Sequence, residues 1–125
     1  MRTTTQVIHD HLARRLAGDL EGDLERNFST SVVLLSGFGT YRGHDGIRQS
    51  AALLTEAVHG GSFAYNRTVI EGSYGFLEWT ADDGEHSISD GADSFHVVDG
   101  LIVFQTVHYT AWPEPSIDDV RRREH

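Results

Sequence analysis

One carboxyl group in the sequence shares a predicted strand face with apolar side chains. Within residues 89–112, Asp93 alternates in step with Phe95 and Val97, the period of a β-strand whose every second side chain points to the same face. A carboxyl group enclosed by apolar side chains loses the hydration of its charged form, so its pKa rises and it can act as a general acid or base near neutral pH. We therefore predict that Asp93 is the principal acid or base of a site. In the alternative interpretation, Asp93 only hydrogen-bonds its neighbours and fixes the sheet.

The hairpin before Asp93 predicts which side chains share its face. Asp-Gly at positions 83 and 84 lies between two alternating runs, the strongest short-range signal for a two-residue turn. Such a turn pairs residues whose numbers sum to 167, so that Tyr74 lies opposite Asp93 and shares its face with Phe76 and Glu78. Glu78 lies about four residues along the strand from Asp93, too far for a direct pair of carboxylates, although a substrate could bridge the two.

The opposite face of this hairpin is predicted to be apolar. It carries Leu77, Trp79 and Ile88, and the last strand adds Phe104 and Thr106. Because a large apolar patch is rarely left in water, we predict that this outer face forms a homodimer interface.

The turn at Asp99-Gly100 leaves two registers open for the last strand. A two-residue turn places Thr106 and His108 on the Asp93 face. A turn in which Gly100 forms a left-handed bulge brings Gln105, Val107 and Tyr109 there instead. The spacing alone does not choose between them.

The hydrophobic period changes from helical to extended along the chain. Apolar residues recur at helical spacing in three segments, 5–17, 20–28 and 47–58. A short apolar run at 31–36 predicts a buried strand, and the glycine-rich segment 37–46 is predicted as a loop. The period is two in the segments 62–72, 73–83, 85–98 and 101–112, which predicts a four-strand antiparallel meander. The fold class is thus α+β, with three helices covering one face of a curved antiparallel sheet.

Composition excludes several classes of function. The net charge of −9 disfavours nucleic acid as a partner, because phosphate binding requires a basic surface. The sequence has no cysteine and no lysine, which excludes thiolate and Schiff-base chemistry. No apolar run is long enough to span a membrane and no signal peptide is recognised, so we expect a cytoplasmic protein without a membrane partner. We predict one domain over residues 1–112, followed by a charged tail, 113–125.

The order of the elements and three segments resemble the nuclear transport factor 2-like superfamily, which includes the SnoaL-like polyketide cyclases and the ketosteroid isomerases. The segments are AGDLEGDLERNFSTSVVLL (17–35), YRGHDGIRQ (41–49) and DGADSFHVVDGLIVFQTVHYT (90–110). The resemblance implies a curved sheet that wraps into a cone around a small-molecule pocket, with the helices closing it.

The same resemblance implies roles for individual residues. Asp93 falls where the isomerases hold a protonated aspartic acid that donates a hydrogen bond to a developing oxyanion. The alignment also favours the Gly100 bulge. Two positions depart from the isomerase pattern: Ser36 stands at the place of the base, and His11 stands roughly at the place of the oxyanion tyrosine. Steroid isomerisation is therefore not predicted. We predict an acid–base site of another design instead.

We predict a cofactor-independent enzyme that performs acid–base chemistry on a small, largely apolar molecule, by cyclisation, isomerisation, dehydration or ring hydrolysis. Its catalytic residues would be Asp93, Tyr109 and His11. The predicted substrate contacts are Gln105, Glu78, Tyr74, Phe76, Phe95, Val107, Phe38 and Leu54. A non-catalytic binding protein and a dimeric interaction module of the same fold are the alternatives.

Neither a metal nor a nucleotide cofactor is predicted. His86, His96 and His108 lie on adjacent strands, but their spacing does not bring them to one point. The glycine pattern GFGTYRG is not followed by the alternating strands and helices of a dinucleotide-binding fold.

Overall fold

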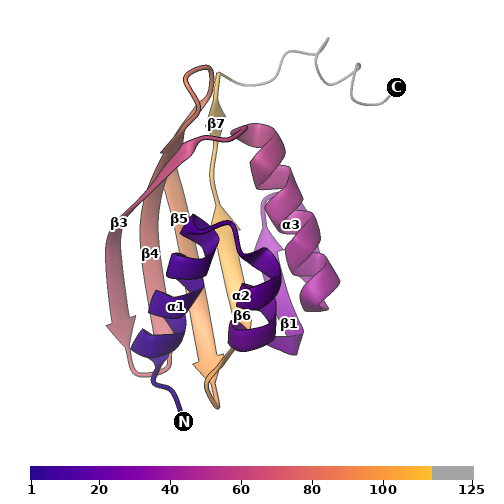
Figure 1. The fold of residues 1–125 in the computed structure, drawn as a ribbon, viewed down its shortest axis with the longest axis vertical. Helices are drawn as coiled ribbons and strands as arrows, with labels where there is room; N and C mark the ends of the chain where they lie inside the picture. The colour runs from indigo at the N-terminus through magenta and orange to yellow at the C-terminus, as the bar shows by residue number, and fades with distance from the viewer. Residues whose placement is uncertain (114–125) are drawn as a thin grey trace.

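A computed structural model describes residues 1–113, in which three helices lie against one curved sheet (Figure 1). The helices are α1 (Thr4–Leu16), α2 (Leu20–Asn27) and α3 (Gly43–Ala57). The strands are β1 (Phe28–Ser36), β2 (Gly39–Arg42), β3 (Ser62–Glu71), β4 (Tyr74–Asp82), β5 (Ser87–Val98), β6 (Leu101–His108) and β7 (Ala111–Trp112). The predicted α+β class is confirmed. The predicted tail lies outside the described residues, apart from Pro113.

The sheet has the strand order β2-β1-β6-β5-β4-β3, and β7 pairs with the start of β5. Strands β3 to β6 form the predicted antiparallel meander, whereas β1 joins β6 in parallel. The segment 37–46 is not only a loop, because Gly39–Arg42 pairs with β1 as strand β2 before α3 begins. Four residues flanked by glycines are too short for a clear period-two pattern, which is why the prediction missed this strand.

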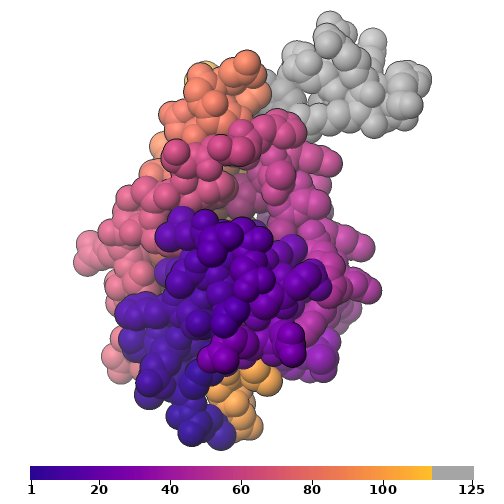
Figure 2. Space-filling view, viewed as in Figure 1, coloured from indigo at the N-terminus to yellow at the C-terminus, as the bar shows by residue number. Residues whose placement is uncertain are grey.

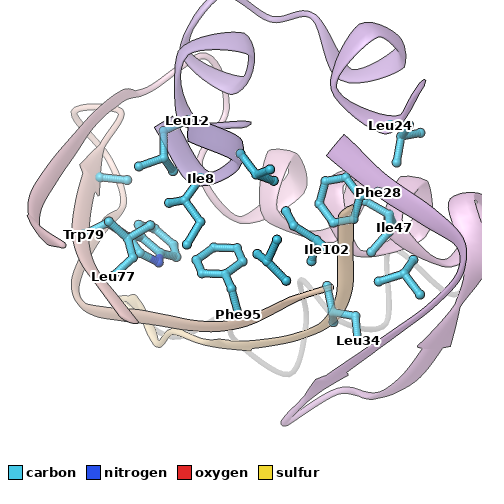
Figure 3. Close-up of a cluster of buried hydrophobic side chains, with 14 of the residues drawn as sticks. Ile8, Leu12, Leu24, Phe28, Leu34, Ile47, Leu77, Trp79, Phe95 and Ile102 are labelled. Atoms are coloured by element: carbon cyan, nitrogen blue, oxygen red, sulfur yellow. The ribbon is translucent and has the colours of Figure 1, made fainter. Parts of the chain in front are cut away.

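The helices bury their apolar stripes on the concave face of the sheet. Helix α1 begins with a capping box between Thr3 and Gln6 and buries Ile8 and Leu12. Figure 3 shows both side chains facing Leu77, Trp79 and Phe95 across the concave side of the sheet. Helix α3 packs against β1 and buries Ile47. Removing a side chain of this size from water contributes about 1.5–3 kcal/mol, so the core fixes where each helix sits.

The β4–β5 hairpin differs from its predicted register in two ways. Its loop has four residues, 83–86, because Asp82 pairs with Ser87. The Asp83 carboxylate stabilises this loop by accepting hydrogen bonds from the backbone N–H groups of Glu85 (2.8 Å) and His86 (2.6 Å). In addition, a β-bulge places two β5 residues, Ser89 and Asp90, opposite Thr80, since Trp79 pairs with Gly91 and Ala81 with Ile88.

The bulge reverses the faces that were predicted for the hairpin. The longer loop alone shifts the pairing of β4 with β5 by two residues, so each side chain stays on its predicted face. The one residue inserted at the bulge makes the shift odd, so the β4 side chains opposite Asp93 change to the other face. Asp93 therefore lies opposite Leu77 rather than Tyr74. The side chains of Leu77, Trp79 and Ile88, predicted for the outer face, are all buried in the core.

Three predicted substrate contacts consequently do not share the face of Asp93. Tyr74, Phe76 and Glu78 lie on the outer face of the sheet, where Tyr74 is 61% exposed and stacks on His96. Phe104 and Thr106 do lie on that face, opposite His96 and Ser94 of β5. The homodimer stays a prediction, but its interface would consist of these residues.

A second bulge decides the register of β6. Val98 pairs with Leu101, so Asp99 and Gly100 form a two-residue turn in which both have positive φ, 52° and 77°. The extra residue lies further on, at Val103, because Val97 pairs with Ile102 and His96 with Phe104. The result is the predicted one, with Gln105 and Val107 on the Asp93 face, but the predicted bulge at Gly100 is wrong.

Gly91 is required beneath the Trp79 ring. A Cβ atom at Gly91 would lie 2.3 Å from Cδ2 of Trp79 and 2.7 Å from its backbone oxygen. We predict that Gly91→Ala displaces the indole and lowers the free energy of unfolding by about 1–3 kcal/mol, as overpacking does. Gly37→Ala is the matched control, since nothing lies within 4 Å of a Cβ there. Urea unfolding of both variants, followed by tryptophan fluorescence, checks this. Equal stability of the two variants would contradict it.

Candidate site around Asp93 and His11

A cavity of about 1020 Å³ lies between the concave face of the sheet and the helices. In Figure 2 the surface is hollowed between the indigo α1–α2 segment and the magenta α3–β3 segment. Most of the wall is apolar, with Leu12, Leu20, Leu34, Leu54, Phe63, Leu77 and Val107 among its residues. The polar residues of the wall include His11, Arg15, Tyr65, Asp93, Gln105 and Tyr109.

Asp93 is buried in the wall of this cavity and accepts two hydrogen bonds. Its Oδ1 accepts from the indole Nε1 of Trp79 at 3.0 Å, and its Oδ2 accepts from Nε2 of Gln105 at 3.2 Å. Trp79 comes from β4 and Gln105 from β6, so the strands on both sides of β5 hold the carboxyl group in place. Only 8% of the residue is exposed.

Burial is the main influence on the ionisation of Asp93. It raises the pKa of the carboxyl group to about 6, because the charged form is removed from water. The hydrogen bond from Trp79, the positive charge of His11 when its ring is protonated, and the hydrogen bond from Gln105 favour the charged form and oppose this rise in pKa. The surrounding donors are neutral, so they offset the desolvation only in part. A carboxyl group of this kind can gain or lose a proton near neutral pH.

His11 forms a buried dyad with Asp23. Its Nδ1 lies 2.7 Å from Oδ2 of Asp23, whose side chain is fully buried. The other oxygen of Asp23 accepts a hydrogen bond from Nδ2 of Asn27 at 2.9 Å. Because a carboxylate only accepts hydrogen bonds, Nδ1 of His11 carries a proton that points to Asp23.

The tautomer leaves the other ring nitrogen of His11 available to the cavity. His11 is part of the cavity wall, and within residues 1–113 its Nε2 has no hydrogen-bond partner. Nε2 of His11 is also not fully enclosed by protein. Within the described residues, the only side-chain polar atom that is fully enclosed and has no hydrogen-bond partner is Nδ1 of His86. Phe28 and Phe95 hold the ring edge-on, with centroids 5.3 and 5.4 Å away. His11 can therefore accept a proton at Nε2 from a molecule in the cavity.

A polar network outside the cavity supports the dyad. Asn27 also donates from Nδ2 to Oδ2 of Asp10 at 2.9 Å and accepts at Oδ1 from Nη1 of Arg2 at 2.7 Å. Asn27 has no exposed surface, so each of its polar atoms depends on these partners. The network ties the start of α1 to the end of α2 and fixes the distance between His11 and Asp23.

Two tyrosines contribute hydroxyl groups to the same cavity. Burial is the main cause that raises the pKa of Tyr109 to about 12, and the nearby charges of Tyr41 and Asp93 contribute to this rise. Burial also raises the pKa of Tyr65. Both hydroxyls therefore keep their protons at neutral pH and act as hydrogen-bond donors rather than bases.

Six of the eleven predicted site residues line the cavity: Asp93, His11, Tyr109, Gln105, Val107 and Leu54. Phe95 lies beneath the wall, where it packs against His11. Phe38 is exposed at the β1–β2 turn, with its ring 5.5 Å from that of Tyr109. The remaining three, Tyr74, Phe76 and Glu78, are on the outer face.

Sequence reasoning missed Trp79, Asp23 and Arg15. The place of Trp79 depends on strand register, which the bulges decide. Asp23 carried a usable signal, because Asp23 and Asn27 are four residues apart on a predicted helix, beside the apolar Leu24 and Phe28. Polar side chains on the buried side of a helix require partners, and His11 is the partner.

No group of three or more histidine or acidic side chains within residues 1–113 is close enough to hold a metal ion. None of the three described helices is long and apolar enough to cross a membrane.

Comparison with known families identifies the chain. A family model described as "SnoaL-like domain" matches residues 8–105. The chain belongs to this SnoaL-like family. The resemblance predicted from the sequence is thereby confirmed. Among curated protein sequences, no significant match to this chain was found.

Solved structures share the fold of this SnoaL-like domain at low sequence identity. A protein from Kribbella flavida has a TM-score of 0.72 at 13% identity, over 95% of this chain and 94% of that one. A putative SnoaL-like polyketide cyclase from Mesorhizobium loti has a TM-score of 0.66 at 18% identity, over 86% of this chain and all of that one. TerC, co-crystallised with polyporic acid, has a TM-score of 0.65 at 17% identity, over 86% of this chain and 91% of that one.

Ionisation of Asp93 is predicted to destabilise the folded protein. Its pKa is about 6 when folded, against 3.8 for an ordinary aspartate, so the folded state binds the proton more tightly between these values. The free energy of unfolding therefore falls as the pH rises from about 4 to 6 and then stays level. Relative to Asp93→Asn, the wild type should lose on the order of 2–3 kcal/mol between pH 4 and pH 7. Urea unfolding of both proteins at several pH values measures the difference, and parallel profiles would show an ordinary pKa.

Asp23 is predicted to set the tautomer of His11. In Asp23→Asn the amide can donate to Nδ1, which moves the ring proton to Nε2, and we expect a loss of about 1–3 kcal/mol in unfolding free energy. Long-range ¹H–¹⁵N NMR spectra of the imidazole report the tautomer directly. Asp45→Asn is the control, because Asp45 pairs with Arg48 on the surface and its side chain is 89% exposed. An unchanged His11 tautomer in Asp23→Asn would contradict the assignment.

Proposed function

We propose that this SnoaL-like domain binds a small, largely apolar molecule in the cavity and transfers protons on it with Asp93 and His11. The observation that carries the proposal is the presence of two proton-transfer groups in one mainly apolar wall. Asp93 has its pKa raised to about 6 by burial, and His11 presents an unpartnered Nε2. Catalysis of proton transfer by one such group typically contributes about 10²–10⁴-fold to a rate.

The two groups suit opposite roles in one reaction. His11, with its Nδ1 proton directed to Asp23, can take a proton at Nε2 and become a cation that the buried carboxylate stabilises. Asp93, when protonated, can donate to an oxygen or carbon of the same molecule. The hydroxyl of Tyr109, which keeps its proton at neutral pH, can stabilise a developing oxyanion.

Cyclisation, isomerisation, dehydration and ring hydrolysis all fit this arrangement. Each requires removal of a proton at one atom and delivery of a proton at another, without a redox step. The fold shared with a putative polyketide cyclase and with TerC, which was crystallised with polyporic acid, supports a small organic molecule as the ligand.

A non-catalytic binding protein is the second candidate, and one observation favours it. Both oxygens of Asp93 already accept hydrogen bonds from Trp79 and Gln105, as expected of a carboxyl group that only fixes the sheet. Under this function Asp93 would shape the cavity, and no proton would be exchanged with the ligand.

An experiment that measures proton exchange distinguishes the enzyme from the binding protein. The protein is incubated in D₂O with a panel of cyclic ketones, quinones and phenols, and deuterium incorporation or product formation is followed by NMR. We expect one or more compounds to react, with a rate that changes around pH 6 because Asp93 titrates there. In Asp93→Asn the reaction should slow by about 10²-fold or more while the ligand still binds.

Phe76→Ala is the matched control, because Phe76 lies on the outer face of the sheet and should leave the rate unchanged. Binding without exchange, at every pH and for every compound that binds, would support the binding protein. Absence of binding for the whole panel would count against both functions.

A further inference from the structure

Arg15 differs from the other half-buried arginines of the described chain. Four arginines in residues 1–113 are partly buried, and three of them are paired. Arg2 contacts Asn27, Arg14 contacts Asp10 and Asp19, and Arg48 contacts Glu21 and Asp45. Arg15 forms neither a hydrogen bond nor an ion pair within these residues. A guanidinium group has five donors, and because none of the Arg15 nitrogens is fully enclosed, these donors are open to water or to a molecule in the cavity.

The position of Arg15 indicates what its partner is. It lies in the last turn of α1, one turn after His11, and lines the cavity. Burial raises the pKa of Tyr65 and of Asp93 in the cavity wall, and the charge of Arg15 partly opposes both rises. The other arginine of the wall, Arg48, is already held by two carboxylates. Arg15 is thus the one guanidinium group of the described wall that is free to bind a molecule in the cavity.

We propose that Arg15 binds an acidic group of the ligand, so that the molecule recognised by this cavity is an organic anion with an apolar body. This inference rests on the proposed function, because it assigns the substrate class of the same site. The acidic group would be a carboxylate, a sulfonate or an ionised hydroxyl on a conjugated ring, each of which offers oxygens to a planar guanidinium.

Charge within the cavity also orients such a ligand. At neutral pH the carboxyl group of Asp93 is mostly ionised, since its pKa is about 6, and it repels a second anion. Arg15 attracts the anionic end, and the apolar wall of Leu12, Leu54 and Val107 contacts the body. The acidic group is thereby held away from Asp93, and the neutral part of the molecule is presented to Asp93 and His11.

The net charge of −9 makes this local cation more significant. The overall field of the protein repels anions, so an anion enters only where a cation outweighs the field nearby. Glu56 of α3 also lines the cavity, but it is exposed to water, where its charge is screened.

Two fluorescent probes that differ by one acidic group test the proposal. They are 8-anilinonaphthalene-1-sulfonate and its uncharged analogue N-phenyl-1-naphthylamine. Trp79 lies in the cavity wall, whereas Trp112 is 65% exposed, so a full-length Trp112→Phe protein leaves Trp79 as the only energy donor. Energy transfer from Trp79 then reports bound probe, and titration yields the dissociation constant of each probe.

We expect Arg15→Gln to weaken binding of the sulfonate by about tenfold or more, the loss typical of a charged hydrogen-bonded pair, and to change binding of the neutral probe by less than about twofold. Arg15→Lys should restore part of the sulfonate affinity. Arg67→Gln is the charge-matched control, because Arg67 is exposed on β3 and does not line the cavity.

The outcomes separate this proposal from the proposed function. If both probes bind but Arg15→Gln weakens them equally, or weakens neither, the cavity binds small molecules and the assignment of Arg15 is wrong. If Arg67→Gln weakens the sulfonate as much as Arg15→Gln does, the effect is one of net charge and the assignment is also wrong. If neither probe binds the wild-type protein, the result contradicts both the proposed function and the assignment of Arg15.

Discussion

The site depends on a single cross-strand contact, the hydrogen bond from the indole of Trp79 to the carboxyl group of Asp93. The two residues lie on neighbouring strands, but the indole must cross the position of Gly91 to reach the carboxyl group. Any side chain at Gly91 would occupy that space. The bulge at Ser89 and Asp90 then turns both Trp79 and Asp93 toward the helices. A local irregularity of one residue therefore decides whether Trp79 and Asp93 share the buried face of the sheet.

The fold buries two aspartates, Asp23 and Asp93, whose hydrogen-bond partners differ. Asp23 lies between two helices with partners on both oxygens, one of them the imidazole of His11, which can become a cation. Asp93 lies in the sheet with only neutral donors, so burial prevails and the pKa of its carboxyl group rises. The first arrangement stabilises a positive charge on its neighbour, and the second produces a group that changes its own charge near neutral pH. Under the proposed function, Asp93 and His11 are the complementary acid and base of the proton transfer.

The charged groups of the cavity wall come from different elements of the fold. Arg15 stands at the end of α1, near the α1–α2 turn that borders the hollow of Figure 2, whereas Asp93, Gln105 and Trp79 form part of the sheet wall. Helix α1 carries both His11 and Arg15, one turn apart, so its packing through Ile8 and Leu12 sets the position of the proposed base and of the anion-binding group together. The core contacts that stabilise the fold therefore also position His11 and Arg15 in the cavity wall.

The sequence by itself determined the fold class and the central residue. Helical spacing around Ile8, Leu12 and Leu16 located α1, the change to a period of two located the meander, and Asp93 among Phe95 and Val97 indicated a buried carboxyl group. These signals are local, because periodicity follows directly from backbone geometry. The family resemblance added His11 and Tyr109, and the structure places both in the cavity wall.

Only the tertiary structure decided which residues surround Asp93. Two bulges, one in β5 and one at Val103 of β6, each insert one residue and exchange the faces of a strand, and no turn signal in the sequence marks either. Trp79, which was predicted on the outer face, therefore lies in the cavity wall. Tyr74, Phe76 and Glu78, which were predicted in the cavity, lie on the outer face. The packing of α1 and α2 on the sheet and on each other places Asp23 beside His11 and Arg15 in the cavity wall. Register and helix placement are set by the sum of many distant contacts, which no short stretch of sequence contains.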